Sequence, residues 1–350
     1  MLHVISPAHF TTSAALFGLM RVAIHQLHQE NHRVIVVGDS VEMKRCRNLG
    51  VPVLGSLSGS LDTSKTLSKR MISFVRDIKI NSSEKIMAWG WHAMCVTEKC
   101  TLDYDTFAII DEVGQRSPCS NGHLVIPTTE VASITANKSG VLEKQLTEPI
   151  IGVEPTTVFA SDAMVKEALK LQGDEFLISI VGELGSWQEI LAMIIRLNSI
   201  RKTAHFVLPS TYRDLAMLMR AANNHGVADR VQCVPSSIRH VDVLRLADCA
   251  WCPSLAPFDC STNVLDVLFA AWMTTPLAVN RDHPVSSIPT IGQQIAWASD
   301  AVEICGWMMD LMNKEKSPYC DYTEQVDTVR SIAAPSRFIQ SLQMRMHALV

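Results

Sequence analysis

The chain has 350 residues, of which 47% are hydrophobic and 19% are charged. This length exceeds what one hydrophobic core usually supports and predicts two domains, while the composition excludes a disordered chain. A formal net charge of -4 excludes a protein that binds nucleic acid through its overall charge.

The N-terminal sequence, MLHVISPAHF, contains neither a basic segment nor a long apolar segment. No apolar run in the chain approaches the ~20 residues that a membrane-spanning helix needs. The ten cysteines follow no regular spacing, as is typical of reduced thiols in the cytosol. These features together predict a cytoplasmic protein.

Cys249 and Cys252 have the C-x-x-C spacing found in zinc and redox sites. They lie in RLADCAWCPS, which predicts a buried strand after a short helix, and residues three apart in a strand point to opposite faces. No second C-x-x-C motif completes a four-ligand zinc site. We therefore expect both thiols to pack in a core, with a metal site as the alternative.

The first 150 residues alternate short β-branched runs with longer segments of helical period, a pattern that predicts βαβ units. The expected strands lie in the segments 2–6, 31–40, 50–57, 85–94, 106–114 and the start of 123–146. The expected helices are 14–29, 64–79 and the remainder of 123–146. These elements predict one doubly wound domain over residues 1–150.

A second series of the same kind follows. The expected strands lie in 175–184, 204–210, 230–236, 249–254 and 276–280, and the expected helices in 187–199, 211–224, 241–247 and 262–273. The fold class is therefore α/β, with two Rossmann-like doubly wound parallel-sheet domains facing a cleft. A ligand is expected at the carboxyl ends of the strands, in the cleft between the domains.

The second half carries a recognisable order of short motifs. They are IVGEL (180–184), HFVLPS (205–210), ADRVQCVPS (228–236), CPS (252–254) and PFDCSTNVLDVLFAAWMTTPLAV (257–279). The first half adds HQENHRVIVVGDS (28–40) and MAWGWHAM (87–94). In this order the chain resembles the GT-B glycosyltransferases of family 4, glycosyl transferases group 1, over almost its whole length. The order of the elements is the specific part of the resemblance.

The resemblance implies a domain organisation with a role for each segment. It makes 1–150 an acceptor-side domain, 151–172 a connection, 173–322 the nucleotide-sugar-side domain and 323–350 a C-terminal helix that packs back toward the first domain. It also implies that the nucleotide sugar is a substrate, with no cofactor and no metal. The expected transfer retains the configuration of the sugar.

The sequence STNVLD is similar to the family's phosphate-binding helix start. Ser261, Thr262, Asn263 and Val264 would begin this helix, where free backbone N–H groups and the positive dipole end suit a diphosphate. The alternative is an ordinary N-cap. Asp266 stands where the family has the Glu that holds the ribose hydroxyls, and the alternative is a solvated helix Asp.

Other positions depart from the family pattern. Phe258 stands at the family's first loop Glu, and Asp259, one residue later, takes that sugar contact only if the loop is one residue shorter. After Gly182 the family's Arg is replaced by Glu183, and its Lys-Gly by the segment 185–189, GSWQE. One lost donor to a developing charge typically costs ~3 to 4 kcal/mol of transition-state stabilisation, so two losses would cripple an enzyme that relied on them.

Four further residues are expected near the donor. The resemblance places Ser210 and Ser254 at the ends of two strands that border the nucleotide. Arg281 and His283, in VNRDHPVSS, lie in a loop that borders the donor site in the family, where either would face a phosphate. The alternative for this loop is a polar surface.

Catalytic and acceptor-side candidates come from the first domain. His92, at the end of WGWH, matches a cleft-lining His of the family and is the catalytic candidate together with Asp259; the alternative is a packed or capped residue. His9 lies in the loop after the first strand. Asp111 and Glu112 follow a strand and would act as a general base in an inverting transfer, or simply begin the next loop.

The predicted helix 64–79 has a basic polar side. In the family such helices touch membranes, because the acceptors are lipid-linked, so the resemblance implies peripheral contact with the inner face of the membrane. The alternative is a solvated helix face. The basic residues are Lys65, Lys69, Arg70, Arg76 and Lys79.

Two functions remain open. The first is a glycosyltransferase that moves a hexose from a nucleotide sugar to a saccharide or lipid-linked acceptor. The second is a catalytically degenerate GT-B-like protein that keeps the fold for binding or assembly. The helix start STNVLD favours the first, and the missing Arg, Lys and Glu favour the second. A sugar-nucleotide epimerase of the same fold has no supporting residues, and no nucleic-acid partner is expected.

Overall fold

The computed structural model describes most of the chain. The residues outside the described set are 6–12, 28–31, 39–42, 44–46, 48–50, 58–63, 79–83, 111–121, 129, 151, 153–158, 172–174, 182–185, 201–203, 211, 213, 236, 254–263, 274, 281–282, 284–295, 299–300, 314–326, 328 and 348–350. Only the backbone is described at 13–15, 17, 64–65, 130–131, 264–266, 280, 296–298 and 301.

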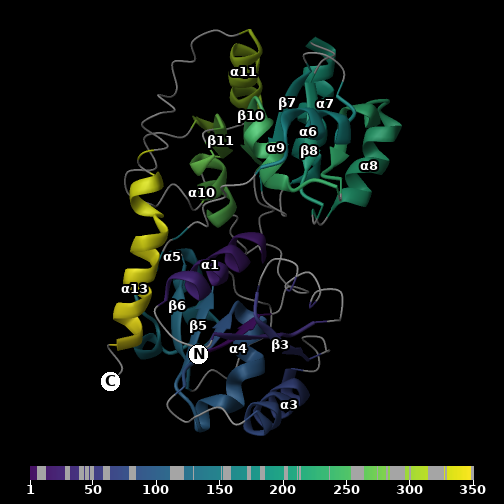
Figure 1. Ribbon diagram of the computed structural model, residues 1–350. Helices are drawn as coiled ribbons and strands as arrows, with labels where there is room; N and C mark the ends of the chain where they lie inside the picture. The colour runs from purple at the N-terminus through teal and green to yellow at the C-terminus, as the bar shows by residue number, and fades with distance from the viewer. Residues whose placement is uncertain are drawn as a thin grey trace. The chain divides into compact units, whose positions relative to one another are not determined.

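The chain divides into two compact units. The first contains Met1–Glu154, Cys260–Leu265 and Ala333–Val350, and the second contains Pro155–Asp259 and Asp266–Ile332. Each unit is built on a six-stranded sheet covered by helices (Figure 1). Every strand pair is parallel. The predicted α/β architecture of two parallel-sheet domains is therefore confirmed.

The first unit has the strand order β3-β2-β1-β4-β5-β6. Its strands are β1 (Leu2–Ile5), β2 (Arg33–Val36), β3 (Val53–Ser56), β4 (Ile86–Trp89), β5 (Thr106–Ile110) and β6 (Leu124–Pro127). Its helices are α1 (Ser13–Gln26), α3 (Ser64–Asp77), α4 (Trp91–Thr97), α5 (Glu130–Lys138) and α13 (Pro335–His347), with short 3-10 turns η3 (Glu98–Leu102) and η4 (Glu143–Gln145).

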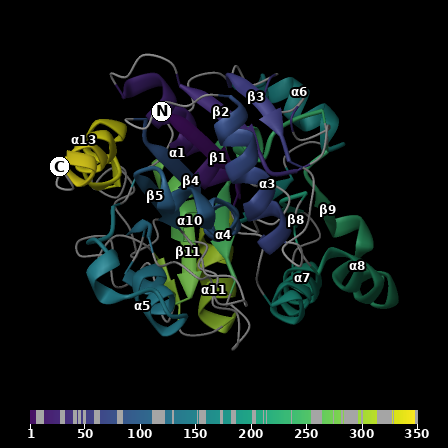
Figure 2. The same ribbon diagram turned by 90° about the horizontal axis from the view of Figure 1, so that it is seen from below.

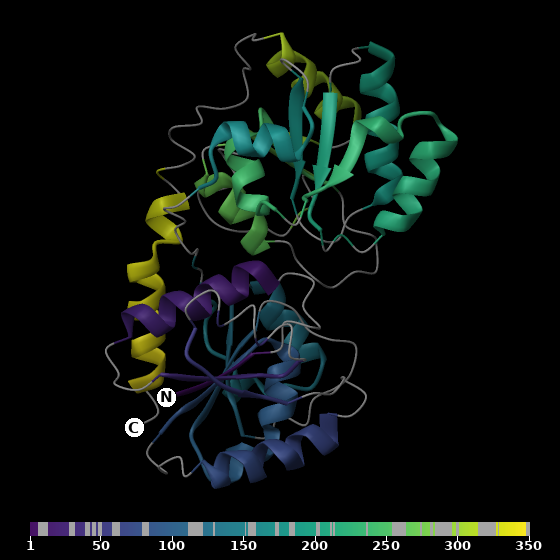
Figure 3. The ribbon, with the colours of Figure 1, turned by 45° about the vertical axis from the view of Figure 1, so that its right-hand side comes forward.

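Side chains alternate across this first sheet, because successive residues of a strand point to opposite faces. One face packs against α3, α4 and α5, with Leu2, Val4 and Ala88 in the same buried cluster. Helices α3 and α4 lie side by side there (Figure 2). On the other side α13, drawn in yellow, runs beside α1, drawn in purple (Figure 3). Lys85 Nζ donates to the Met346 carbonyl over 2.7 Å and ties the end of α13 to this unit.

The second unit has the strand order β12-β11-β10-β7-β8-β9. Its strands are β7 (Phe176–Ile180), β8 (Ala204–Leu208), β9 (Val231–Cys233), β10 (Cys249–Cys252), β11 (Leu277–Asn280) and β12 (Ala296–Ala298). Its helices are α6 (Asp162–Ala168), α7 (Trp187–Ile200), α8 (Leu215–Asn224), α9 (His240–Leu246), α10 (Val264–Trp272) and α11 (Ala301–Met312), with the 3-10 turn η5 (Ala228–Arg230).

The C-x-x-C cysteines lie on β10 as the sequence predicts. Cys249 shares one buried cluster with Trp251 and residues of α7, α8 and α11. Cys252 is also fully buried but does not belong to that cluster. Both thiols therefore pack in the core. Within the described residues no group of three or more His, Cys, Asp and Glu side chains is placed to hold a metal ion.

Helix α6 lies in the segment that the resemblance treats as a connection, yet it belongs to the second unit. Val165 and Leu169 pack with Leu177 and Val207, on the face of the sheet that α9 also covers. Ser161 begins the helix by accepting a hydrogen bond from Met164 N over 3.3 Å. Val165 is the only buried residue of this seven-residue helix, so the sequence shows no clear apolar face that would predict it.

None of the helices that the structure describes combines the length and the apolar character of a membrane span.

Candidate functional site

In the second sheet, β7 and β10 are neighbours, and the strands that follow each of them in the chain are added on opposite sides. From β7 the chain proceeds to β8 and β9 on one side, and β10 then begins the other side. The two strand ends are joined by Val181 N, which donates to the Trp251 carbonyl over 2.8 Å. In open parallel sheets the crevice beyond the carboxyl ends, where the strand order reverses in this way, is where ligands bind. We call the carboxyl ends of β7 and β10 the second-unit switch point.

The expected donor residues fall on the two connections that leave this switch point. Gly182 and Glu183 follow β7, and Ser254, Asp259, Ser261, Thr262 and Asn263 follow β10; all seven lie outside the described residues. The backbone places Val264 as the first residue of α10 and Asp266 in its first turn. The predicted helix therefore begins directly after this connection, and its first N–H groups have no partner within the helix.

The neighbouring strands carry the remaining donor candidates. Ser210 is exposed just beyond β8, and His283 is 4% exposed just beyond β11. Burial lowers the pKa of His283 to about 4, so the ring is neutral at pH 7 when no anion is bound. Arg281 lies outside the described residues. Ser210 and His283 thus follow strands that flank β7 and β10 in the sheet.

Sequence reasoning missed a partly buried pair near the carboxyl end of β7, formed by the buried Ser179 and the half-buried His240. Ser179 Oγ lies 3.0 Å from His240 Nε2, and the His240 ring also hydrogen-bonds to the Ile180 carbonyl. A carbonyl only accepts, so a ring nitrogen of His240 donates to Ile180. Burial lowers the pKa of His240 to about 4, although the Ile180 bond opposes the shift. The pair anchors the end of β7 to the first residue of α9.

The first sheet has an equivalent reversal between β1 and β4. His92 follows β4 as predicted, but it is the second residue of α4 rather than part of a loop. Gly90, with φ of 89°, makes the sharp turn that a residue with a Cβ adopts only with strain. His92 is 2% exposed. His9, beyond β1, lies outside the described residues.

The other first-unit candidates are less informative. Asp111 and Glu112 follow β5 and lie outside the described residues. On the predicted basic helix, now α3, Lys69 and Arg70 are exposed. Arg76 is exposed as well, and its NH2 group pairs with Asp103 over 2.7 Å. Only the backbone of Lys65 is described, and Lys79 lies outside the described residues.

Comparison with family models gives no match, and neither does comparison with curated proteins. Solved structures match over the full length. HepE from Anabaena in complex with UDP-glucose has a TM-score of 0.76 at 10% identity, covering 99% of this chain and 100% of that chain. Sucrose-phosphate synthase from Thermosynechococcus elongatus has 0.68 at 13% identity, covering 100% and 99%. A UDP-N-acetylglucosamine 2-epimerase has 0.57 at 13% identity, covering 94% of each chain.

These likenesses establish the fold. Each match covers both units and almost the whole of the other chain. The order of the two domains is therefore shared, as well as the architecture of each. The fold is the GT-B type that the sequence predicts. One of these similar structures is an epimerase, so the likenesses show the fold and not the reaction.

Proposed function

We propose that this chain is a glycosyltransferase that moves a hexose from a nucleotide sugar to a saccharide or lipid-linked acceptor, with retention of configuration and without a metal. The observation that carries the proposal is the full-length likeness to HepE, whose structure contains UDP-glucose. The resemblance to family 4 rests on the order of motifs in the sequence and supports the same class of reaction.

The second-unit switch point is the proposed nucleotide site. Helix α10 begins immediately after the connection that leaves β10, so its first N–H groups, which have no partner within the helix, and its positive dipole end suit the diphosphate. Ser261, Thr262 and Asn263 precede this helix and allow a close approach of the backbone. Asp266, in the first turn, is the proposed ligand of the ribose hydroxyls. Arg281, beyond β11, is the proposed cation.

The proposed reaction forms one bond and breaks another. The acceptor oxygen bonds to the anomeric carbon on the same face from which the nucleoside diphosphate leaves with the electrons of the broken bond, so the configuration is retained. The acceptor hydroxyl loses its proton to a base, for which His92 is the candidate, and Asp259 is the candidate contact of the sugar hydroxyls. His9 and Glu112, which follow β1 and β5, are the proposed acceptor contacts.

A catalytically degenerate binding or assembly protein is the second candidate. The observation that favours it is the charge of the sequence at the donor site: Glu183 replaces a cation of the family, and the segment 185–189 contains no Lys. His283, neutral when no anion is bound, supplies no preorganised positive charge in its place. Without a preorganised positive charge the diphosphate is a poorer leaving group.

A thermal-shift series with UDP, GDP, ADP and their sugars tests both candidates. A ligand present at 100 times its Kd stabilises the fold by ~2.7 kcal/mol, which raises Tm measurably. We expect one nucleotide to raise Tm, Asp266→Ala to abolish the rise, and the control Asp310→Ala, a helical Asp of α11 in the same unit, to leave it unchanged.

The outcomes separate the candidates. Consumption of the sugar form of that nucleotide in the presence of a saccharide acceptor supports the transferase. Binding of the nucleotide with no turnover of any sugar donor supports the degenerate binder. No response to any nucleotide contradicts the transferase, and a rise that survives in Asp266→Ala contradicts the ribose assignment.

The proposal places the protein in the cytoplasm, with peripheral membrane contact through the exposed cations of α3 when the acceptor is lipid-linked. Lys69 and Arg70 are the exposed basic side chains of this helix that carry the argument, because cations attract anionic headgroups. Sedimentation with phosphatidylglycerol vesicles tests it. Loss of binding in a Lys69→Ala/Arg70→Ala variant supports the contact, and no binding by the unmodified protein contradicts it.

A further inference from the structure

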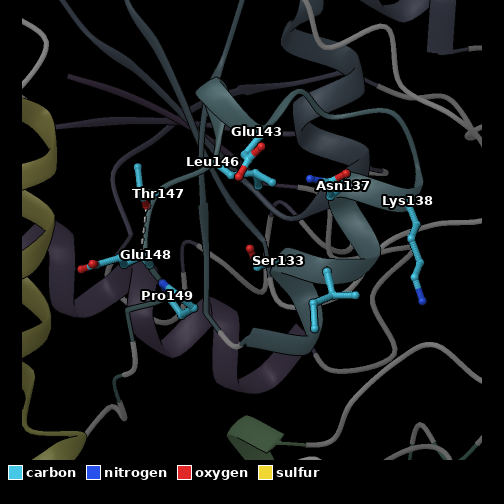
Figure 4. A pocket seen from close by; sticks show the side chains of 9 residues that line it. Ser133, Asn137, Lys138, Glu143, Leu146, Thr147, Glu148 and Pro149 are labelled. Atoms are coloured by element: carbon cyan, nitrogen blue, oxygen red, sulfur yellow. Dashed lines mark hydrogen bonds between the residues drawn. The ribbon is translucent and has the colours of Figure 1, made fainter.

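An open groove of about 650 Å³ lies in the first unit, between the second half of α5 and the segment 143–149 (Figure 4). Helix α5 lines one side with Ser133, Ile134 and Asn137. This groove contains none of the residues assigned to the donor or to catalysis.

The wall opposite α5 is a fixed extension of the sheet. Leu146 forms a parallel bridge with Val125 of β6, and Thr147 N donates to the Val125 carbonyl over 3.0 Å. Further along, Ile150 N donates to the Pro127 carbonyl over 2.9 Å. The segment therefore follows the edge of β6 and is fixed to it by these hydrogen bonds.

The floor and the rim of the groove differ in chemistry. Ile134 is 49% exposed, and with Leu146 and Pro149 it gives the groove an aliphatic surface. Asn137 and Glu143 are exposed on the rim, where an amide and a carboxylate offer both donors and acceptors. A ligand that presents C–H groups on one face and hydroxyls on its edges complements both surfaces.

The charges disfavour an anionic ligand such as a phosphate. Among the residues that line the groove Lys138 is the only cation, against the carboxylates Glu143 and Glu148. Glu148 pairs with Arg345 of α13 over 2.9 Å, so this pair is close to neutral. Asn137 and Lys138 lie in the last turn of α5, where the negative end of the helix dipole repels anions.

We propose that this groove binds a neutral oligosaccharide. The inference rests on the proposed function for one step only, namely that the bound sugar is a part of the saccharide acceptor away from its reacting hydroxyl. Exposed residues at both ends, Lys138 and Pro149, leave the groove open, so a linear chain can pass through it rather than end in it.

Saturation-transfer NMR on the full chain tests the proposal with four probes: maltotetraose, cellotetraose, chitotetraose and α-1,6-mannotetraose. We expect at least one to bind, with at least tenfold weaker binding in Ile134→Arg, which replaces the aliphatic floor by a long cation. The matched control is Ile200→Arg, because Ile200 is a helical isoleucine with 48% exposure in the other unit. It should bind as the unmodified protein does.

A second pair of variants tests the same groove without the arginine that Ile134→Arg introduces, which could affect folding. Glu143→Gln removes a rim carboxylate and should weaken the same probe at least threefold, whereas Glu167→Gln, an exposed residue of α6, should not. Binding of none of the four probes, or binding that neither groove variant weakens, overturns the proposal.

The nucleotide thermal shift is measured on the same samples. If the groove binds a sugar probe but no nucleotide raises Tm, the inference is supported and the transferase is contradicted. The reverse result, a nucleotide response with no binding of sugar by the groove, contradicts the inference and leaves the transferase standing. The two failures are therefore distinguishable.

Discussion

His3 Nε2 lies 2.8 Å from His32 Nδ1, inside the first unit. The indole Nε1 of Trp89 donates to His3 Nδ1 over 3.0 Å, and His32 Nε2 lies 3.2 Å from the Leu27 carbonyl. An indole N–H only donates and a carbonyl only accepts, so the three bonds run in one direction, from Trp89 through His3 and His32 to Leu27. Both rings are neutral in this arrangement.

Acid disrupts this hydrogen-bonded chain. Burial lowers the pKa of His3 well below its usual value, and the charges of His32 and the Met1 amino group add to the effect. Burial also lowers the pKa of His32, with smaller effects of the Met1 amino group and His25 in the same direction and an opposing effect of the Leu27 bond. Below about pH 6.5 these histidines bind protons in the unfolded chain but stay neutral in the folded chain. The free energy of unfolding therefore falls as the pH falls.

The first prediction concerns His3→Asn. At pH 8 the variant should lose ~1 to 3 kcal/mol of unfolding free energy, because buried polar groups of Trp89 and His32 lose their partner. Between pH 6.5 and 5 each neutral buried histidine contributes a slope of up to ~1.4 kcal/mol per pH unit, so the variant should show a shallower slope. Urea denaturation at several pH values measures both quantities.

The control for this experiment is His347→Asn, an exposed residue at the end of α13 in the same unit. It should leave both the stability at pH 8 and the pH slope unchanged. A His3→Asn variant with the full pH slope of the unmodified protein would show that other groups dominate the acid response.

The second prediction concerns the partly buried pair of Ser179 and His240. Ser179→Ala leaves His240 Nε2 without its 3.0 Å partner and should cost ~1 to 3 kcal/mol in the second unit. Because the end of β7 loses an anchor at the switch point, the nucleotide response should weaken too. Denaturation and nucleotide titration measure the two effects. Ser199→Ala, at an exposed position of α7, is the control and should change neither.

Much of the architecture follows from the sequence because buried strands and amphipathic helices have distinct periods. The segments that predict β7, α7 and β8 match the structure to within a few residues, since each has a strong pattern. Helix α4 is different: WHAMCVT is seven residues long, and its buried face is set by packing on the sheet rather than by a visible period. Helix α6 is also only seven residues long, and with one buried residue it shows no clear period.

Part of the candidate site also follows from the sequence, and part of it needs the structure. The resemblance directs attention to the connections after β7 and β10, and the strand order alone makes them the two sides of the switch point. The contact of Ser179 with His240 spans 61 residues, and no spacing rule links two such positions. The neutral state of His283 also needs the structure, because its pKa depends on burial.

The third prediction concerns the C-x-x-C motif. Because Cys249 and Cys252 both pack in the core, treatment with EDTA should leave Tm unchanged, and the purified protein should contain no stoichiometric zinc. Cys249→Ser should still lower stability by ~1 to 3 kcal/mol, since it buries a hydroxyl among apolar side chains. Metal analysis and thermal denaturation measure these quantities. One zinc per chain, lost in Cys249→Ser, would contradict the core interpretation.

The fourth prediction concerns Gly152, which lies against α1 and α13. A Cβ at this position would come within 2.8 Å of Leu19 Cδ2 and within 2.8 Å of Phe338 Cβ. The Leu19 side chain can rotate, but Phe338 Cβ is fixed by the backbone of α13, so a helix would have to shift. Gly152→Ala should therefore cost ~1 to 3 kcal/mol of unfolding free energy, as overpacking usually does.

Gly306 provides the matched control for Gly152. It is an exposed glycine inside α11, and a Cβ there would meet nothing within 4 Å. Gly306→Ala should raise stability by ~0.5 to 1 kcal/mol, because alanine loses less backbone entropy in a helix. Urea denaturation of both variants compares the same chemical change with opposite expected signs. Equal effects of the two substitutions would show that α13 is not held against Gly152 in solution.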